Sequence, residues 1–393
     1  MSILSNPIPD NERINSIDTM RGFAILGIFL TNMLAFHSPM LYLNPYVWWS
    51  TKSDQTIYSF IDFFVQASFY PLFALLFGFG LMIMRERSVA KGFNFTPIAI
   101  RRLSMLLVIG CIHAFFIWHG DILINYAILG LIALLFLGMS GKALLLTGIL
   151  TYMIPNILYG LLYFLATLVT PTNDYYHHDE AIKSVEFYQN GTFWEITVQR
   201  FYDWSQVNLN SIETSLFLFF TIFPFLLIGA GISKLNVVRN NMQNKKAIKV
   251  LLLIFVIVGS LLKLLPFVVR NLFSEYIQDI FGGPLLAVSY ALVIMLLMEK
   301  HSASLQMFQA VGKLAISNYL FQSIVATLIF YNYGLGLYSK ISVGTGTLLA
   351  ITIFLVQAYI STKWVQNYQY GPVEWIWRAV SYWKIPNWKK FTK

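Results

Sequence analysis

The chain has 393 residues, of which 57% are hydrophobic and only 11% are charged, and its formal net charge is +9. A soluble domain carries about 25% charged residues, so this composition excludes a water-soluble enzyme or binding domain. Nucleic-acid binding would need a basic face on a soluble module, whereas here the basic residues stand in short clusters between apolar segments. The positive charge is therefore expected to reflect membrane topology.

Ten segments are apolar over about 20 residues, the length that a membrane-spanning helix needs. They are predicted at 21–40, 57–84, 99–118, 122–139, 143–168, 213–233, 247–269, 277–299, 314–333 and 343–363. The first segment is interpreted as a retained helix and not a signal peptide, because no small-residue cleavage site follows it. The sequence thus predicts an all-α integral membrane protein with about ten transmembrane helices.

The predicted helices divide the chain into five parts. These are an N-terminal tail (1–20), a five-helix part (21–168), a polar loop (169–212), a second five-helix part (213–363) and an interfacial tail (364–393). Cytoplasmic loops carry an excess of Lys and Arg, and most of the 27 basic residues fall on one side if both termini are cytoplasmic. The polar loop is then extracytoplasmic. Lys263 lies inside a predicted helix and is expected to extend toward its end.

Three polar residues share one face of the first predicted helix. Asp18, Arg21 and Asn32 fall on the same side at 100° per residue, with Asn32 about 16 Å deeper than Arg21. A charge buried in the membrane is a candidate for function because its burial is costly. The alternative interpretation is that Asp18 caps the helix and Arg21 marks the inner interface.

The third predicted helix repeats this spacing with Arg102 and His113. A neutral buried imidazole can accept or donate a proton. The short connection that follows brings further polar residues to the same outer mouth, namely His119, Asp121 and Tyr126. We interpret His113 and Asp121 as a functional pair. The alternative is an ordinary helix–helix hydrogen bond.

Polar residues elsewhere give weaker signals. Asp62, near the start of the second predicted helix, is expected to face the same mouth as His113. Asn318 and Gln322 are four residues apart, a spacing that favours helix–helix hydrogen bonds. Glu374 and Arg378 are spaced as an ion pair on a helix, and a surface anchor would explain the Trp residues around them.

These motifs resemble the YeiB-like family of bacterial inner-membrane proteins, also called domain of unknown function 418. The similarity covers nearly the whole chain, in order. It runs through Asp18…Arg21-Gly22…Gly27-Ile28…Asn32, Leu72-Phe73-Ala74-Leu75-Leu76-Phe77-Gly78, His113…Trp118…Gly120-Asp121-Ile122-Leu123…Tyr126, Val311-Gly312-Lys313…Asn318-Tyr319…Gln322 and Gly371-Pro372-Val373-Glu374-Trp375…Arg378. The resemblance implies a multi-pass protein of the bacterial plasma (inner) membrane.

That family is similar to a superfamily of transmembrane acyltransferases, which includes the lysosomal heparan glucosaminide acetyltransferase and the acyltransferase-3 enzymes. The resemblance implies transfer of an acyl group from cytoplasmic acyl-CoA to an extracytoplasmic or lipid-linked acceptor. Acyltransferase-3 proteins carry Arg, ten residues and then His in the first helix. Here Arg21 is followed after ten residues by Asn32, so the expected histidine is missing at that position.

Two functions from different classes follow as hypotheses. In an acyltransferase, Arg21, Arg102 and Asn32 would bind acyl-CoA, because guanidinium groups suit phosphates. The catalytic candidates are His113, Asp121 and Asp62. In a transporter or exporter of a small molecule, the same His and Asp residues would form a proton relay or substrate site.

No metal cofactor and no nucleic-acid partner is expected. The run His177-His178-Asp179-Glu180 resembles a metal-binding tract, but adjacent loop residues rarely supply a whole coordination sphere. The expected partners are membrane lipids, an unidentified small-molecule or glycan acceptor and a second copy of the chain in a homo-oligomer.

Overall fold

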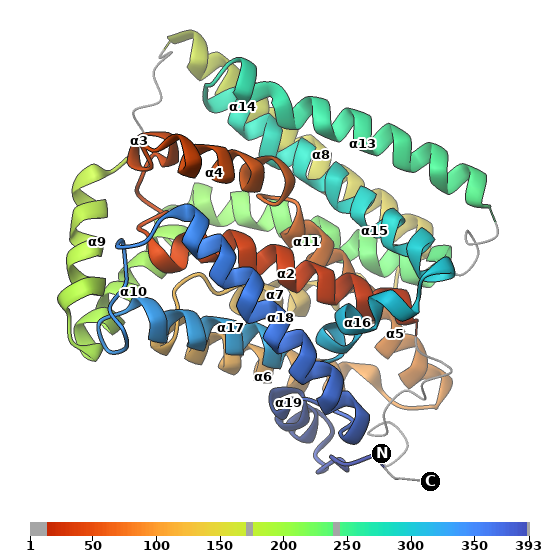
Figure 1. The fold of residues 1–393 in the computed structure, drawn as a ribbon. Helices are drawn as coiled ribbons and strands as arrows, with labels where there is room; N and C mark the ends of the chain where they lie inside the picture. Colours follow the sequence, from red (N-terminus) through yellow and green to blue (C-terminus); the bar gives the residue numbers. More distant parts are fainter. Residues whose placement is uncertain (1–13, 170–175, 239–243, 391–393) are drawn as a thin grey trace.

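The computed structural model describes residues 14–169, 176–238 and 244–390, which form helices joined by short turns (Figure 1). Within these residues, eight helices are long and apolar enough to cross a membrane, or nine if one bent pair counts as a single span. The prediction of an all-α membrane protein is confirmed at this level. The division of the chain into five parts stays a prediction.

The eight helices differ in whether they are continuous. They are α2 (Asn15–His37), α4 with α5 (Lys52–Phe64 and Phe69–Ala90), α6 (Phe95–Phe116), α8 (Gly141–Val169), α11 (Ile212–Lys234), α13 (Lys245–Val268), α14 with η2 and α15 (Leu272–Ile277, Gln278–Gly282 and Gly283–Lys300) and α18 (Val343–Asn367). The bent pair consists of η3 with α16 (Ala303–Leu305 and Gln306–Lys313) and α17 (Ala315–Phe330), at 78°. The shorter helices are α3 (Pro45–Trp48), α7 (Leu123–Ala133), α9 (His178–Asn190), α10 (Phe193–Asn208) and α19 (Pro372–Tyr382).

The structure corrects two predicted helices and adds two helices within the predicted polar loop. The second predicted helix is broken between α4 and α5, where Ala67 adopts a φ of 57° that a helix cannot contain. The helix predicted at 122–139 is only the 11 residues of α7, about 16 Å at 1.5 Å per residue and half of a hydrocarbon core. The polar loop holds α9 and α10, and Thr192 and Glu195 form a capping box at the start of α10. Of the predicted N-terminal tail, 1–13 lie outside the described residues and α2 begins at Asn15.

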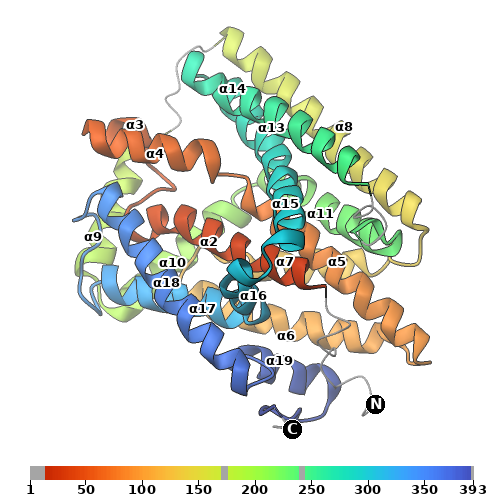
Figure 2. The same ribbon diagram turned by 45° about the vertical axis from the view of Figure 1, so that its right-hand side comes forward.

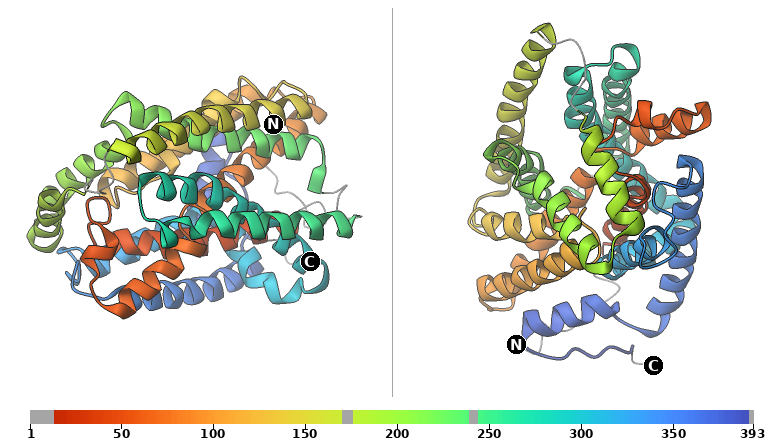
Figure 3. Two further views of the ribbon diagram at one scale, coloured as in Figure 1. Left: turned by 90° about the horizontal axis from the view of Figure 1, so that it is seen from above. Right: turned by 90° about the vertical axis from the view of Figure 1, so that its left-hand side faces the viewer.

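The helices form a bundle with two distinct ends. Figure 1 shows α3, α9 and α10 at the left, which we call the distal end, and the α5–α6 turn at the right, the proximal end. Figure 3 (right) looks onto the distal end. In Figure 2, α8, α13, α14 and α15 lie above the central helices, and α19 lies below them. The predicted interfacial tail therefore packs as α19 against α6 and α17.

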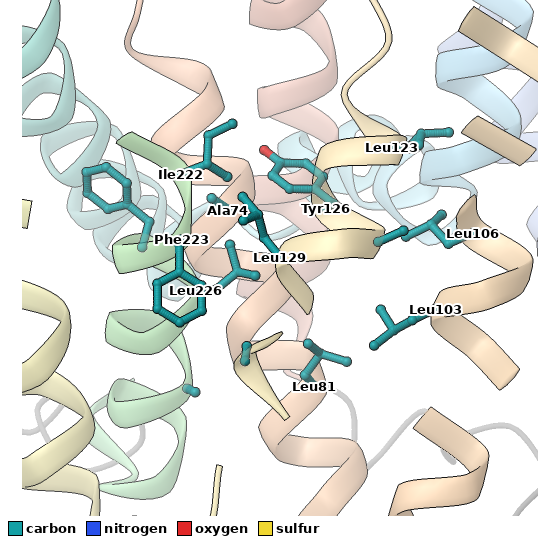
Figure 4. Close-up of a cluster of buried hydrophobic side chains, with 14 of the residues drawn as sticks. Ala74, Leu81, Leu103, Leu106, Leu123, Tyr126, Leu129, Ile222, Phe223 and Leu226 are labelled. Atoms are coloured by element: carbon teal, nitrogen blue, oxygen red, sulfur yellow. The ribbon is translucent and has the colours of Figure 1, made fainter. Parts of the chain in front are cut away.

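Apolar side chains of four helices meet in the middle of the bundle. Leu81 of α5, Leu103 of α6, Leu129 of α7 and Leu226 of α11 belong to one buried cluster (Figure 4). This cluster fixes α7 between α6 and α11, although α7 is too short to span a membrane alone.

Glycines allow two helix pairs to touch backbone to backbone. A Cβ added at Gly229 of α11 would lie 2.0 Å from the carbonyl oxygen of Leu75, and one at Gly78 of α5 would lie 2.0 Å from that of Leu226. Small residues at such crossings let membrane helices pack closely. The two contacts together fix the crossing of α5 and α11.

The same arrangement joins α2 to α16. A Cβ at Gly22 would lie 1.9 Å from the Phe308 oxygen, and one at Gly312 would lie 1.8 Å from the Asp18 oxygen. The start of α2, which carries Asp18 and Arg21, is therefore held against the bent pair.

We expect Gly229→Ala to lower the midpoint of thermal unfolding of the protein in detergent. The new methyl group cannot fit against the Leu75 carbonyl, and overpacking of this kind costs about 1–3 kcal/mol. Gly138→Ala is the matched control, because a Cβ there meets nothing within 4 Å. Equal midpoints for the two variants would contradict the backbone contact.

Candidate active site

A cavity of about 930 Å³ lies between α2, α5, α6, α7, the α16–α17 pair and α19. Along α5 its lining runs from Phe73 to Ala90, which is about 25 Å at 1.5 Å per residue. Its lining changes from charged to apolar along the helices: Arg21 is followed by Ile25 and Ile28 on α2. The cavity is therefore long, with a charged proximal part and an apolar inner part.

The charged part of the cavity carries an excess of positive charge. Its basic lining residues are Arg21, Arg87, Lys91, Arg102, Lys313 and Arg378, and its acidic ones are Asp18, Glu86 and Glu374. This excess favours an anionic ligand, and guanidinium groups are suited to phosphate or carboxylate.

Several of these cations are held in fixed positions. Arg21 Nη1 lies 3.3 Å from Asp18 Oδ1, which sets the guanidinium at the start of α2. The Arg102 Cζ atom lies 3.5 Å from the centroid of the Trp377 ring, and Trp377 Nε1 donates a hydrogen bond to the Arg102 carbonyl oxygen. Arg378 lies over the ring of Tyr370. Because Trp377, Tyr370 and Arg378 all line the cavity, the C-terminal segment forms part of its wall.

A buried histidine–aspartate pair lies next to the inner part. His113 Nδ1 is 2.8 Å from Asp121 Oδ1, and neither side chain is exposed to solvent. The other Asp121 oxygen accepts a hydrogen bond from the Ile124 backbone nitrogen at the start of α7. A carboxylate can only accept, so Nδ1 carries the proton and Nε2 is the basic nitrogen. Among the described residues, His113 Nε2 has no hydrogen-bond partner.

Tyr319 stands between this pair and the cavity. Its ring centroid is 5.0 Å from that of His113, its hydroxyl donates to the Gly120 carbonyl oxygen at 3.2 Å, and it lines the cavity. His113 and Asp121 do not line the cavity themselves. One aromatic side chain thus separates the basic nitrogen from the inner end. Sequence reasoning did not select Tyr319, although it stands in the Asn318-Tyr319 motif.

The cavity brings together about half of the residues predicted for function. Asp18, Arg21, Arg102, Tyr126, Glu374 and Arg378 line it. Asn32, Asp62, His119, Asn318 and Gln322 do not.

The predicted site residues that do not line the cavity have other hydrogen-bond partners or neighbours. Asn318 and Gln322 hydrogen-bond to Ser361 and Gln357 of α18, as predicted for helix–helix contacts. His119 lies 3.3 Å from the Tyr188 hydroxyl beneath α9, and burial lowers its pKa. Asp62 does not contact His113: its carboxylate accepts hydrogen bonds from Gln278 and Tyr46, beside Lys263. Asn32 is half-buried on α2.

Lys263 does not extend out of its helix as predicted. Its side chain is fully buried, and Nζ donates to the carbonyl oxygens of Asp62 and Gln66 and lies 3.3 Å from Asp279 Oδ1. Three acceptors inside the protein are enough to offset the burial of the ammonium group, so it has no need to reach the interface.

Glu374 forms hydrogen bonds with the start of α17, and not the i,i+4 ion pair with Arg378 that was predicted within α19. Its carboxylate accepts hydrogen bonds from the backbone nitrogens of Ile316 at 2.7 Å and Ser317 at 3.0 Å. These nitrogens belong to the first turn of α17, which has no side-chain cap of its own. Burial raises the pKa of Glu374. The residue therefore joins α19 to the helix that carries Tyr319.

Comparison with known proteins gives relatives that cover nearly the whole length of the chain. Residues 232–384 match the family described as "Protein of unknown function (DUF418)". The chain is 34% identical over 393 residues to the uncharacterized protein YxaH of Bacillus subtilis (strain 168), covering 96% of each chain. It is also 27% identical over 399 residues to the uncharacterized protein YeiB of Escherichia coli (strain K12), covering 94% of this chain and 96% of that one.

We expect Glu374→Ala to lower the thermal midpoint more than removal of a surface charge does. The change leaves two backbone nitrogens of α17 without their acceptor, and an unsatisfied buried group costs about 1–3 kcal/mol. Glu299→Ala is the control, since Glu299 pairs with Lys245 at the partly exposed ends of their helices and such pairs contribute at most about 1 kcal/mol. Equal losses in both variants would show that Glu374 does not hold α17.

Proposed function

The chain belongs to the DUF418 family, and on that premise we propose that it is a membrane-embedded acyltransferase. Membership rests on the relative that is 34% identical over nearly the full length, and it confirms the resemblance found in the sequence. The names of the relatives assign no activity, so the proposal rests on the site of this chain.

One observation carries the proposal: a single cavity joins a basic mouth to an apolar inner end beside a histidine–aspartate pair. An acyl-CoA donor has the matching chemistry, with phosphates at one end and an acyl thioester at the other. The volume of about 930 Å³ lies within the range of roughly 300–1,000 Å³ for small-molecule sites. The phosphates would bind near Arg21, Arg102 and Arg378, and the acyl group would reach toward Tyr319.

In the proposed reaction His113 acts as the general base. Its Nε2 takes a proton from a hydroxyl or amine of the acceptor while Asp121 holds the Nδ1 proton and orients the ring. The acceptor oxygen or nitrogen attacks the thioester carbonyl carbon, and the carbon–sulfur bond then breaks. The CoA thiolate leaves and receives the proton from the imidazolium. Because Tyr319 separates His113 from the cavity, its side chain has to turn aside during the reaction.

The proposal includes an orientation in the membrane. The proximal end carries the α5–α6 turn and the basic mouth, and we place it in the cytoplasm because Lys and Arg are enriched on that side of membrane proteins. The membrane is then a bacterial plasma membrane. The distal end, with α9 and α10, faces outward, where an extracytoplasmic or lipid-linked acceptor would enter.

A transporter is the second candidate, and one observation favours it. The fully buried Lys263 ammonium group lies 3.3 Å from the partly exposed Asp279 carboxylate, between α13 and η2, and ionisable groups inside a membrane domain often belong to transport pathways. Uptake or efflux that depends on the proton gradient and is lost in Lys263→Met would favour this function. An enzyme without transport activity would show no such flux.

We expect purified protein in detergent to bind acyl-CoA saturably, and Arg102→Ala to weaken that binding by roughly ten- to hundredfold. A charge-assisted hydrogen bond to phosphate is worth about 1.5–3 kcal/mol. Lys300→Ala is the control, because Lys300 is an exposed cation outside the cavity. Binding is measured by isothermal titration calorimetry. Absence of saturable binding by the wild type would exclude the donor site.

We expect His113→Ala and Asp121→Asn to keep acyl-CoA binding while slowing release of free CoA by about a hundredfold or more. General-base catalysis contributes about 10²–10⁴ in rate, and the neutral amide of Asn cannot supply the negative charge that stabilises the imidazolium. His301→Ala, at an exposed histidine, is the control. Thiol release is followed with a thiol-reactive dye. An unchanged rate in both pair variants would remove His113 from the mechanism.

A further inference from the structure

A second cavity lies at the opposite end of α2 from the basic mouth. It has a volume of about 160 Å³ and lies against Met40, Leu43 and Pro45, which follow the last turn of α2. Its polar lining residues are Tyr46, Tyr58, Asp62, Gln66, Tyr176, Arg270, Glu275, Gln278 and Asp279. At about 30 Å³ for each water-sized group, it holds roughly five non-hydrogen atoms.

The charges around this cavity do not balance. Three carboxylates, those of Asp62, Glu275 and Asp279, face two cations, Arg270 and Lys263. Lys263 contacts the carboxylate of Asp279, but it contacts only the backbone oxygen of Asp62. Counted as formal charges, one negative charge remains in excess.

Asp62 is the carboxylate on which this excess rests. Its Oδ2 atom accepts hydrogen bonds from Gln278 Nε2 at 3.0 Å and from the Tyr46 hydroxyl at 3.3 Å. Both donors are neutral, since burial raises the pKa of Tyr46 to about 12. Among the described residues, its Oδ1 atom has no hydrogen-bond partner and no cation contacts the carboxylate. The residue is only 8% exposed, so bulk water does not provide full compensation.

A second polar group in the cavity also lacks a partner. Tyr58 lines the cavity and is 7% exposed, and its hydroxyl makes no hydrogen bond with any of the residues that the structure describes. Its ring lies edge to face with Tyr46 at a centroid distance of 5.0 Å. The Tyr58 hydroxyl and the Asp62 Oδ1 atom, each on a residue less than 10% exposed, thus lack partners on the wall of one cavity, where a bound polar group would satisfy both.

Aromatic rings at the cavity favour an organic cation. The guanidinium of Arg270 already lies 3.4 Å from the centroid of the Tyr46 ring, so cation–π contact occurs at this site. A hard metal ion would need six or more oxygen ligands at fixed distances. No group of three His, Cys, Asp or Glu side chains in the described ranges is placed to hold one.

We propose that this cavity binds a small organic ammonium group, with Asp62 as its counter-ion and Tyr58 as a hydrogen-bonding partner. The ammonium donates to Asp62 Oδ1 and to the Tyr58 oxygen, and a short carbon chain fills the remaining space. Part of the wall is η2, where Gln278 and Asp279 stand on a π-helical turn, a feature that is frequent at functional sites. The site is independent of the acyl donor cavity.

The test is calorimetric titration of the purified full-length protein in detergent with ethanolamine hydrochloride. Ethylene glycol, which has the same size and no charge, is the neutral control, and sodium chloride at equal ionic strength controls for salt. We expect saturable binding of ethanolamine alone. Wild-type protein that does not bind ethanolamine, or binds ethylene glycol equally well, would overturn the proposal.

Variants locate the binding. We expect Asp62→Asn to weaken ethanolamine binding at least tenfold, and its amide oxygen can still accept from Gln278 and Tyr46, so the fold is kept. Tyr58→Phe keeps the ring and removes only the hydroxyl, and we expect it to weaken ethanolamine binding severalfold. It provides the test of the site if Asp62→Asn does not fold. Unchanged affinity in either folded variant would overturn the proposal.

Two further sets of binding measurements separate this site from the donor cavity and identify the source of the ammonium group. Asp121→Asn should leave ethanolamine binding unchanged, and Asp62→Asn should leave acyl-CoA binding unchanged, so either proposal can fail without the other. In nanodiscs, competition by phosphatidylethanolamine but not by phosphatidylglycerol would assign the site to a lipid headgroup. Equal ethanolamine affinity in both lipids would assign it to a free amine.

Discussion

The structure depends on one constraint: a polar group buried among apolar helices must find its partner inside the protein. Each missing partner costs several kcal/mol in the absence of water. Asp121 has partners for both carboxylate oxygens. One lies 2.8 Å from His113 Nδ1, and the other accepts a hydrogen bond from the Ile124 backbone nitrogen at the start of α7. Glu374 does the same for α17 from a different helix. Asp121 and Glu374 therefore each hold the start of a helix in place through hydrogen bonds to its backbone.

The same constraint makes unpaired groups informative. His113 Nε2 is a buried atom without a partner near the large cavity, and Asp62 accepts hydrogen bonds through only one of its two carboxylate oxygens in the small one. The two cavities also differ in the charge of their lining residues. The one at the start of α2 is lined by an excess of cations, and the one beyond its end by an excess of carboxylates. A single helix thus separates a site suited to anions from a site suited to cations.

Much of the fold was predictable because membrane helices leave a long apolar signal. The pairing of His113 with Asp121 was also predictable, since only a short connection separates them. The positions of Asp62 and Lys263 were not, because they depend on how α4, α13 and η2 cross, and one sequence carries no such distances. Tyr319 was missed as a site residue for a related reason. It lies beside His113 in space, but it stands on α17 and His113 on α6, so no sequence pattern connects the two. The break at Ala67 was not predicted, because no Pro or Gly stands at that position to indicate it.

The position of α19 has a consequence for biosynthesis. Trp377, Arg378 and Glu374 form one wall of the large cavity, yet α19, which carries them, follows α18, the last candidate span among the described residues. Every membrane-spanning helix has left the ribosome before that wall exists. The spanning helices can therefore insert before this cavity is complete, and its basic mouth forms only once α19 has packed against α6 and α17.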